Sequence, residues 1–281
     1  MRGRARRFAL RPRGAFARRA WQAMCLCLAV QPASAETITK AEYAAPTTRY
    51  AHGVLGDAVE WGALRLSLKD GRRLTMTLPD TLVFEDVAPR LADLDSDGAP
   101  EVIVVESSLT QGARLAIYGP EGRITATPHI GQRNRWLAPI GAADMDGDGA
   151  VEIAYIDRPH LAKTLRIWRF HEGQLTDVAT AKGLTNHKIG WGHIPGGIRR
   201  CGNGPEIITA NGNWSRIMAT RFTSEGITSR PMADYTGPDS LNAALICPRS
   251  HLSQNTPGAR EGQRPSHRSD RRSRSEAAQL R

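Results

Sequence analysis

The chain has 281 residues and a formal net charge of +10, a balance that first suggests a nucleic-acid-binding protein. The basic excess lies at the two ends, with 8 Arg and no acid in residues 1–20 and 7 Arg against 3 acids in residues 251–281. The chain between these ends is close to neutral, which argues against a nucleic-acid partner. Its length permits one large core or two small ones.

The first 35 residues have the order of a secretory signal peptide. An Arg-rich start precedes the apolar run WQAMCLCLAV, and the small residues ASA end at Ala35. The apolar run is shorter than the roughly 20 residues that a membrane-spanning helix needs. We therefore predict cleavage after Ala35, a periplasmic or secreted location, and a mature form without a membrane span.

Four hairpin patterns follow within residues 36–250. Each joins two apolar or alternating runs through a polar turn with one glycine, as a β-hairpin requires. The glycines Gly71, Gly122, Gly173 and Gly226 are 51, 51 and 53 residues apart. A period near 50 built from short strands is typical of a β-propeller blade. We expect an all-β domain over residues 36–250, a β-propeller of about four blades.

The last unit of this domain is shorter than the others. We expect a strand near residues 240–247 to pair into the first blade and close the ring, because closure removes exposed sheet edges. The alternative is that the chain is a fragment of a larger ring. Residues 251–281 contain no Phe, Tyr or Trp and few apolar residues, so we predict a disordered basic tail.

Two acidic loops repeat on the same period, in LADLDSDGAPEVIVV (91–105) and GAADMDGDGAVEIAYI (141–156). Both have Asp at positions 1, 3 and 5, Gly at position 6 and Glu at position 9. Clustered carboxylates repel one another unless a cation lies among them. An all-oxygen set in a flexible loop favours calcium over magnesium, with the carbonyl of position 7 as a further ligand. The predicted ligands of two calcium ions are Asp93, Asp95, Asp97, Ala99 and Glu101, and Asp144, Asp146, Asp148, Ala150 and Glu152.

Two alternatives to a calcium site share part of this pattern. An EF-hand loop begins in the same way but needs a glutamate at position 12, where this chain has Val104 and Tyr155. Acidic turns with glycine are also common without any metal. Two copies in phase are hard to explain by loop chemistry alone, so we favour a bound ion with a structural role.

The stretches VAPRLADLDSDGAPEVIVV and LAPIGAADMDGDGAVEIAYI resemble the FG-GAP or VCBS repeats of integrin-like β-propellers. The resemblance implies a propeller whose inter-strand loops bind calcium through the two ligand sets given above. It also implies a role in adhesion, protein contact or carbohydrate binding, and some such domains are appendages of secreted enzymes.

A third copy, GGIRRCGNGPEIIT, departs from the acidic pattern. Arg199 and Cys201 take the first two ligand positions and Asn203 the third, so a guanidinium would repel calcium and the loop is expected to be metal-free. Without the signal peptide, the chain keeps two cysteines, Cys201 and Cys247, and export favours one disulfide over two buried thiols. We predict that this disulfide and an Arg199–Glu206 ion pair fasten the loop in place of an ion.

No catalytic residues are predicted, because the familiar nucleophile, metalloprotease and phosphate-binding motifs are missing from the sequence. His187, Trp191 and His193 could form a ligand patch suited to sugars or could fill strand and loop space. Our leading hypothesis is a non-enzymatic binding, adhesion or scaffold module with a protein or carbohydrate partner. The alternative is a secreted carbohydrate-active enzyme, a lyase or hydrolase, on the same frame.

Overall fold

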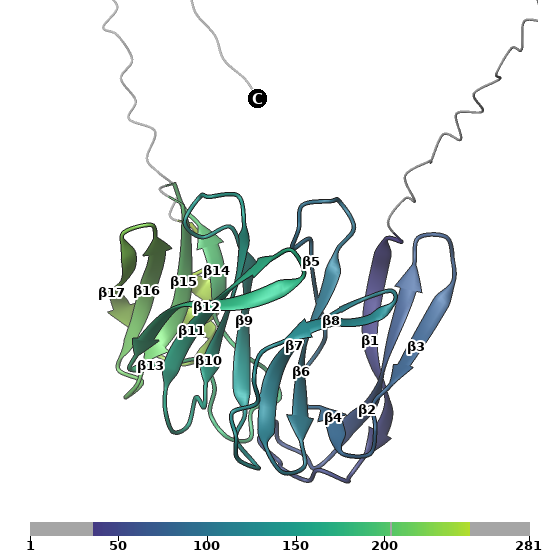
Figure 1. Cartoon of the computed structure of the whole chain (residues 1–281). Helices are drawn as coiled ribbons and strands as arrows, with labels where there is room; N and C mark the ends of the chain where they lie inside the picture. Colours follow the sequence, from purple (N-terminus) through teal and green to yellow (C-terminus); the bar gives the residue numbers. More distant parts are fainter. Residues whose placement is uncertain (1–35, 203, 248–281) are drawn as a thin grey trace, which may run out of the picture.

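The computed structural model describes residues 36–202 and 204–247 (Figure 1), so the predicted signal peptide (1–35) and basic tail (251–281) lie outside the described residues. The described part is nearly all β, as expected from the sequence, with a single short helix, α1 (Pro238–Ala243). The strands are β1 (Ile38–Thr47), β2 (Glu60–Leu68), β3 (Arg73–Thr77), β4 (Leu82–Phe84), β5 (Arg90–Ala92), β6 (Glu101–Ser108), β7 (Gly112–Gly119), β8 (Gly122–Ala126), β9 (Leu137–Ala143), β10 (Val151–Asp157), β11 (Thr164–His171), β12 (Gln174–Lys182), β13 (Leu184–Thr185), β14 (Gly197–Arg200), β15 (Pro205–Asn211), β16 (Arg216–Thr223) and β17 (Gly226–Asp234).

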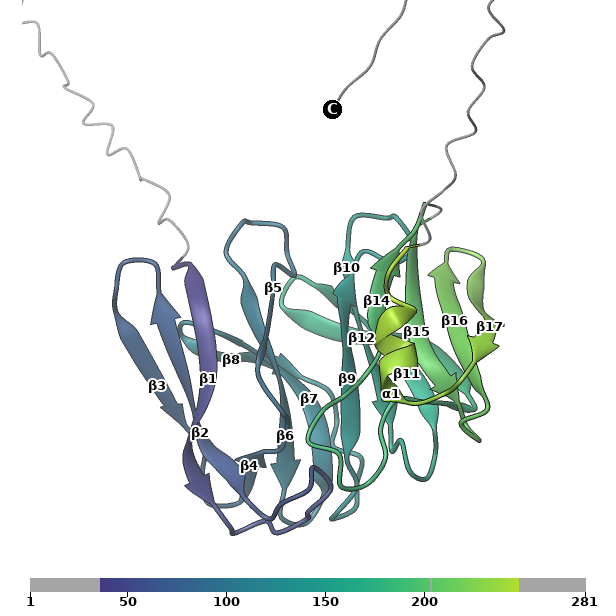
Figure 2. The same ribbon diagram turned by 180° about the vertical axis from the view of Figure 1, so that it is seen from behind.

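The strands form three antiparallel sheets that follow one another along the chain. The first has the order β1-β2-β4-β6-β7-β8, with β3 beside β2 and β5 beside β6. A single residue pair, Trp61 with Phe84, joins its two halves. The second sheet is β12-β11-β10-β9, and the third is β13-β15-β16-β17 with β14 beside β15. Figures 1 and 2 show them side by side, from β1–β3 at one end to β16–β17 at the other.

All four predicted hairpins are present. They join β2 to β3, β7 to β8, β11 to β12 and β16 to β17, each with its predicted glycine in or next to the turn. The registers close at the turns, as in the pairs Gly119–Gly122 and Thr223–Gly226. Local turn chemistry and alternating side chains therefore decide these hairpins.

The main core lies between neighbouring sheets. Every residue of β6 is buried, and Ile103, Ile117, Ile153, Ile167 and Ile207 from β6, β7, β10, β11 and β15 belong to one apolar cluster. Strands covered on both faces read as continuous apolar runs, which explains EVIVVES and VEIAYI in the sequence. Burial of these strands holds the connecting loops at the two ends of the sheets.

The C-terminal segment differs from the sequence prediction. Residues 238–243 form α1, and no strand in the described ranges pairs the third sheet with the first, so the predicted closing strand is wrong. Pro238 suits a first helical turn because its missing N–H has no partner to lose there. Leu241 is fully buried against Ile208 and Ala210 of the third sheet, and Figure 2 shows α1 lying over that sheet.

The first and third sheets approach each other through loops instead. The backbone N–H of Gly190, between β13 and β14, donates to the carbonyl of Val54, between β1 and β2, at 3.0 Å. Gly56 allows this approach, because a Cβ there would lie 2.9 Å from the Gly190 carbonyl oxygen. The contact joins a loop of the first sheet to a loop of the third.

Candidate metal centre

The first acidic loop connects β5 to β6 and folds around its own carboxylates. Asp93 Oδ2 accepts the Gly98 N–H at 3.1 Å, Asp95 Oδ1 accepts the Asp97 N–H at 3.2 Å, and Asp97 Oδ1 accepts the Ala99 N–H at 2.7 Å. Gly98 has a φ of +86°, which a residue with a side chain rarely adopts, so the glycine at position 6 is required by the turn. The loop thus turns its carboxylates toward one region.

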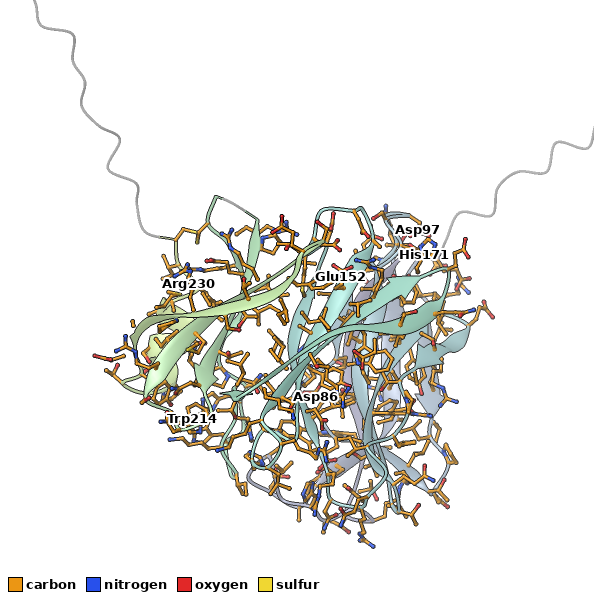
Figure 3. All side chains as sticks on the ribbon, turned by 60° about the vertical axis from the view of Figure 1, so that its left-hand side comes forward. Asp86, Asp97, Glu152, His171, Trp214 and Arg230 are labelled. Carbon is orange, nitrogen blue, oxygen red and sulfur yellow. A yellow bond between two sulfur atoms is a disulfide. The ribbon has the colours of Figure 1, made fainter. Side chains whose placement is uncertain are left out.

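The second loop connects β9 to β10 and repeats this arrangement. The N–H groups of Gly147 and Gly149 donate to Asp144 at 2.7 and 3.2 Å. Asp146 Oδ1 accepts the Asp148 N–H at 3.3 Å, and Asp148 Oδ1 accepts the Ala150 N–H at 2.9 Å. Figure 3 shows Asp97 of the first loop and Glu152, at the end of the second, toward the same edge of the molecule.

Three of the predicted ligands converge in each loop. Side-chain oxygens of Asp93, Asp95 and Glu101 lie within 4.8 Å of one another, and so do those of Asp144, Asp146 and Glu152. Either cluster could hold a metal ion. Asp97 and Asp148 are not in these clusters and instead accept N–H bonds from Ala99 and Ala150. The ligand roles predicted for all ten residues of the two loops stay predictions, and only the convergence of these six side chains is observed.

The two glutamates tie the loops to the sheet. Glu101 and Glu152 are 8% and 0% exposed, and each accepts a backbone N–H from its own loop, from Leu94 at 2.9 Å and from Met145 at 2.8 Å. Burial raises the pKa of both carboxyls, and the nearby charge of Asp95 raises that of Glu101 further. A cation among the carboxylates would offset both effects.

An arginine distinguishes the second loop from the first. Arg169 lies opposite Glu152 in the β10–β11 register. Its Nε donates to Glu152 at 2.7 Å, its Nη2 donates to Asp146 at 2.5 Å, and its Nη1 lies 3.0 Å from Asp148. In the first loop the register from Val102–Tyr118 places Gly119 at the corresponding position. The second loop carries its own cation, whereas no basic side chain within residues 36–202 and 204–247 forms a salt bridge with the carboxylates of the first.

In the third loop, three arginines pair with one glutamate. Glu206 accepts hydrogen bonds from Arg199 at 2.6 and 3.0 Å, from Arg221 at 3.1 Å and from Arg230 at 2.9 Å. Burial acts to raise the pKa of Glu206, but the three guanidinium groups outweigh it and lower that pKa to about 2. Arg199 and Glu206 are paired, as the sequence suggested, and Arg221 is the counterpart of Arg169.

A disulfide joins the third loop to the segment that follows α1. Cys201 and Cys247 are bonded at 2.08 Å, with their Cα atoms 5.3 Å apart. Arg199 Nη1 also donates to the carbonyl of Ala244 at 2.9 Å. The disulfide and the arginine contacts thus fasten the third loop at the position where carboxylates cluster in the first two loops.

The predicted His and Trp patch is partly interior. His187 is fully buried, and its Nε2 lies 2.8 Å from the Trp191 carbonyl oxygen, so it fills loop space. Trp191 stacks on His193 with ring centroids 5.3 Å apart. Sequence reasoning did not find His52 and His160, which lie in the same region, because no local motif connects residues from such distant loops.

The described strands and loops define a class: an all-β repeat protein with two acidic loops at equivalent positions, either of which could hold a metal ion. Residues 93–155, from the first aspartate of one loop to the strand after the other, match the FG-GAP-like repeat family. The resemblance inferred from the sequence is thereby confirmed for this stretch. The chain has no match among curated proteins or solved structures. None of the described helices has the length and apolar character to cross a membrane.

Proposed function

We propose that this protein is an exported, non-enzymatic β-propeller module of about four blades that binds a protein or carbohydrate partner, with calcium as its structural ion. The observation that carries the proposal is the repeated carboxylate cluster, three side chains within 4.8 Å in each of two loops 51 residues apart. The FG-GAP-like match over residues 93–155 supports a binding or scaffold role. The disulfide is consistent with an oxidising compartment.

Calcium suits the clusters because every donor is a carboxylate oxygen and the loops are irregular. Each cluster combines two loop aspartates with one glutamate of the following strand. Glu101 is the first residue of β6, and Glu152 is the second residue of β10. An ion bound there would fix the loop to the sheet and remove the repulsion among the carboxylates. We place the stronger site in the first loop, where no arginine pairs with the carboxylates among the described residues.

Thermal unfolding of the purified protein tests this proposal. A ligand that binds only the folded state at about one hundred times its Kd adds about 2.7 kcal/mol, so calcium should raise the Tm above its value in chelator by about 5–10 °C. The double variant Asp93→Asn and Asp95→Asn should lose most of this shift. Asp80→Asn, at a side chain that is 99% exposed, is the matched control and should keep it. An equal Tm in calcium and in chelator would contradict a structural ion.

A further inference from the structure

A pocket of about 310 Å³ lies at the end of β9 and β10 opposite their acidic loop. Its lining comes from four connections, of which three contribute His52 between β1 and β2, Trp136 before β9, and His160 between β10 and β11. Ile189, from the connection between β13 and β14, completes one side. Loops from all three sheets thus build the pocket.

His52 is held in place by a buried carboxylate. Its Nδ1 lies 2.5 Å from Glu85 Oε1, and the other oxygen of Glu85 accepts the hydroxyl of Ser107. Glu85 is 0% exposed, and its backbone carbonyl accepts the Trp136 indole N–H at 2.8 Å. Since Nδ1 is engaged, the Nε2 of His52 is the ring nitrogen that remains for a ligand.

A second imidazole is oriented by a relay. His187 Nε2 donates to the Trp191 carbonyl, because a carbonyl only accepts, so His187 Nδ1 accepts from His160 Nε2 at 3.1 Å. This leaves Nδ1 of His160 as an acceptor. Burial lowers the pKa of both rings to about 4, so both are neutral at pH 7. A buried imidazole such as His187 and a buried carboxylate such as Glu85 are costly to a fold unless they are paired, and here both are.

The mouth of the pocket carries positive charge. Arg135 lines it, and no acidic side chain in the described ranges pairs with its guanidinium, which donates to the Asn134 carbonyl at 3.1 Å. Arg158 also lines the pocket and is paired with Asp157.

The pocket also has apolar walls. Leu161 and Ile189 line it although these residues are 63% and 70% exposed. Apolar walls combined with a few polar groups are a feature of small-molecule sites. They offer contact area to a ring rather than to an extended polar group.

We propose that this pocket binds a carboxylate carried on a single ring. The carboxylate pairs with Arg135 and the ring lies against Leu161 and Ile189. A hydrogen-bond donor on the ring, in ligands that have one, reaches His52 or His160. The volume is at the lower end of the range for small-molecule sites, which suits one ring. The inference rests on the proposed binding function and gives it a site and a ligand class. A uronic acid residue of an acidic polysaccharide and an aromatic carboxylic acid share this chemistry.

Equilibrium binding to the calcium-loaded protein tests the proposal, with galacturonate and benzoate as acids and galactose and benzyl alcohol as their neutral counterparts. At least one acid should bind saturably, about tenfold or more tightly than its neutral counterpart, since a charged hydrogen bond is lost without the carboxylate. Binding of galacturonate alone identifies a sugar acid, and binding of benzoate alone identifies an aromatic acid. Binding by neither acid, or equal binding by a neutral counterpart, overturns the proposal.

Variants separate this pocket from the rest of the molecule. Arg135→Gln should weaken binding of the acid about tenfold or more. Arg216→Gln, at an exposed arginine of β16, should leave the affinity unchanged. Retained affinity in Arg135→Gln would overturn the assignment. A protein whose Tm rises with calcium but which binds no acid would refute the pocket alone. A protein that binds the acid without any calcium effect would refute the calcium part of the proposed function alone.

Discussion

Arg169 should compete with calcium for the second acidic loop. Its guanidinium lies 2.5–3.0 Å from Asp146, Asp148 and Glu152, the position that a cation would need. Hydrogen bonds between charged groups contribute about 1.5–3 kcal/mol each, and the side chain is 26% exposed, so water screens part of this. An ion that displaces the arginine would lose about 1.5–3 kcal/mol of binding free energy, a factor of about ten to one hundred in Kd.

The test is calcium titration calorimetry of Arg169→Gln, which removes the charge and keeps most of the aliphatic stem. Both proteins compared carry Asp93→Asn and Asp95→Asn, so that only the second loop is measured. Arg169→Gln should tighten calcium binding about tenfold or more and should lower the Tm in chelator by about 4–8 °C, for a loss of about 2 kcal/mol. Arg216→Gln is the control and should change neither value. Unchanged or weaker calcium binding by Arg169→Gln would refute the competition.

Three further predictions concern the third sheet. Reduction of the Cys201–Cys247 bond, which spans 46 residues, should lower the free energy of unfolding by about 4 kcal/mol; urea unfolding with and without reductant checks this, and an unchanged midpoint would contradict it. The pKa of Glu206 in the folded state is lowered to about 2, so its ion pairs stabilise the fold at pH values above its unfolded-state pKa near 4.5 and are lost as the pH falls toward 2. Over this pH range the urea midpoint should fall more steeply in the parent protein than in Glu206→Gln. Parallel plots of urea midpoint against pH for the two proteins would exclude the effect. Leu241→Ala should cost about 2–5 kcal/mol, measured in the same way, and a cost below 1 kcal/mol would show that α1 does not anchor there.

Much of the candidate metal centre was predictable because its chemistry is local. The carboxylates of each loop lie within nine residues and bond to the backbone of the same loop, so spacing alone placed them together. The hairpins followed for the same reason, since a glycine turn and two alternating runs contain their own register. The Arg199–Glu206 pair could also be predicted from the sequence, because the two residues are seven positions apart around one turn.

Contacts across strands and between loops were decided only by the tertiary structure. Arg169 meets Glu152 through the β10–β11 register, and nothing in either segment by itself indicates that an arginine would enter one loop and be absent from the other. The helix α1 replaced the expected strand because burial of Leu241 on the third sheet outweighs a weak local pattern. The pocket at His52, Arg135 and His160 depends on loops more than one hundred residues apart. The sequence by itself thus determined the repeat, the hairpins and the acidic loops, whereas the packing of the sheets decided which charges and rings face one another.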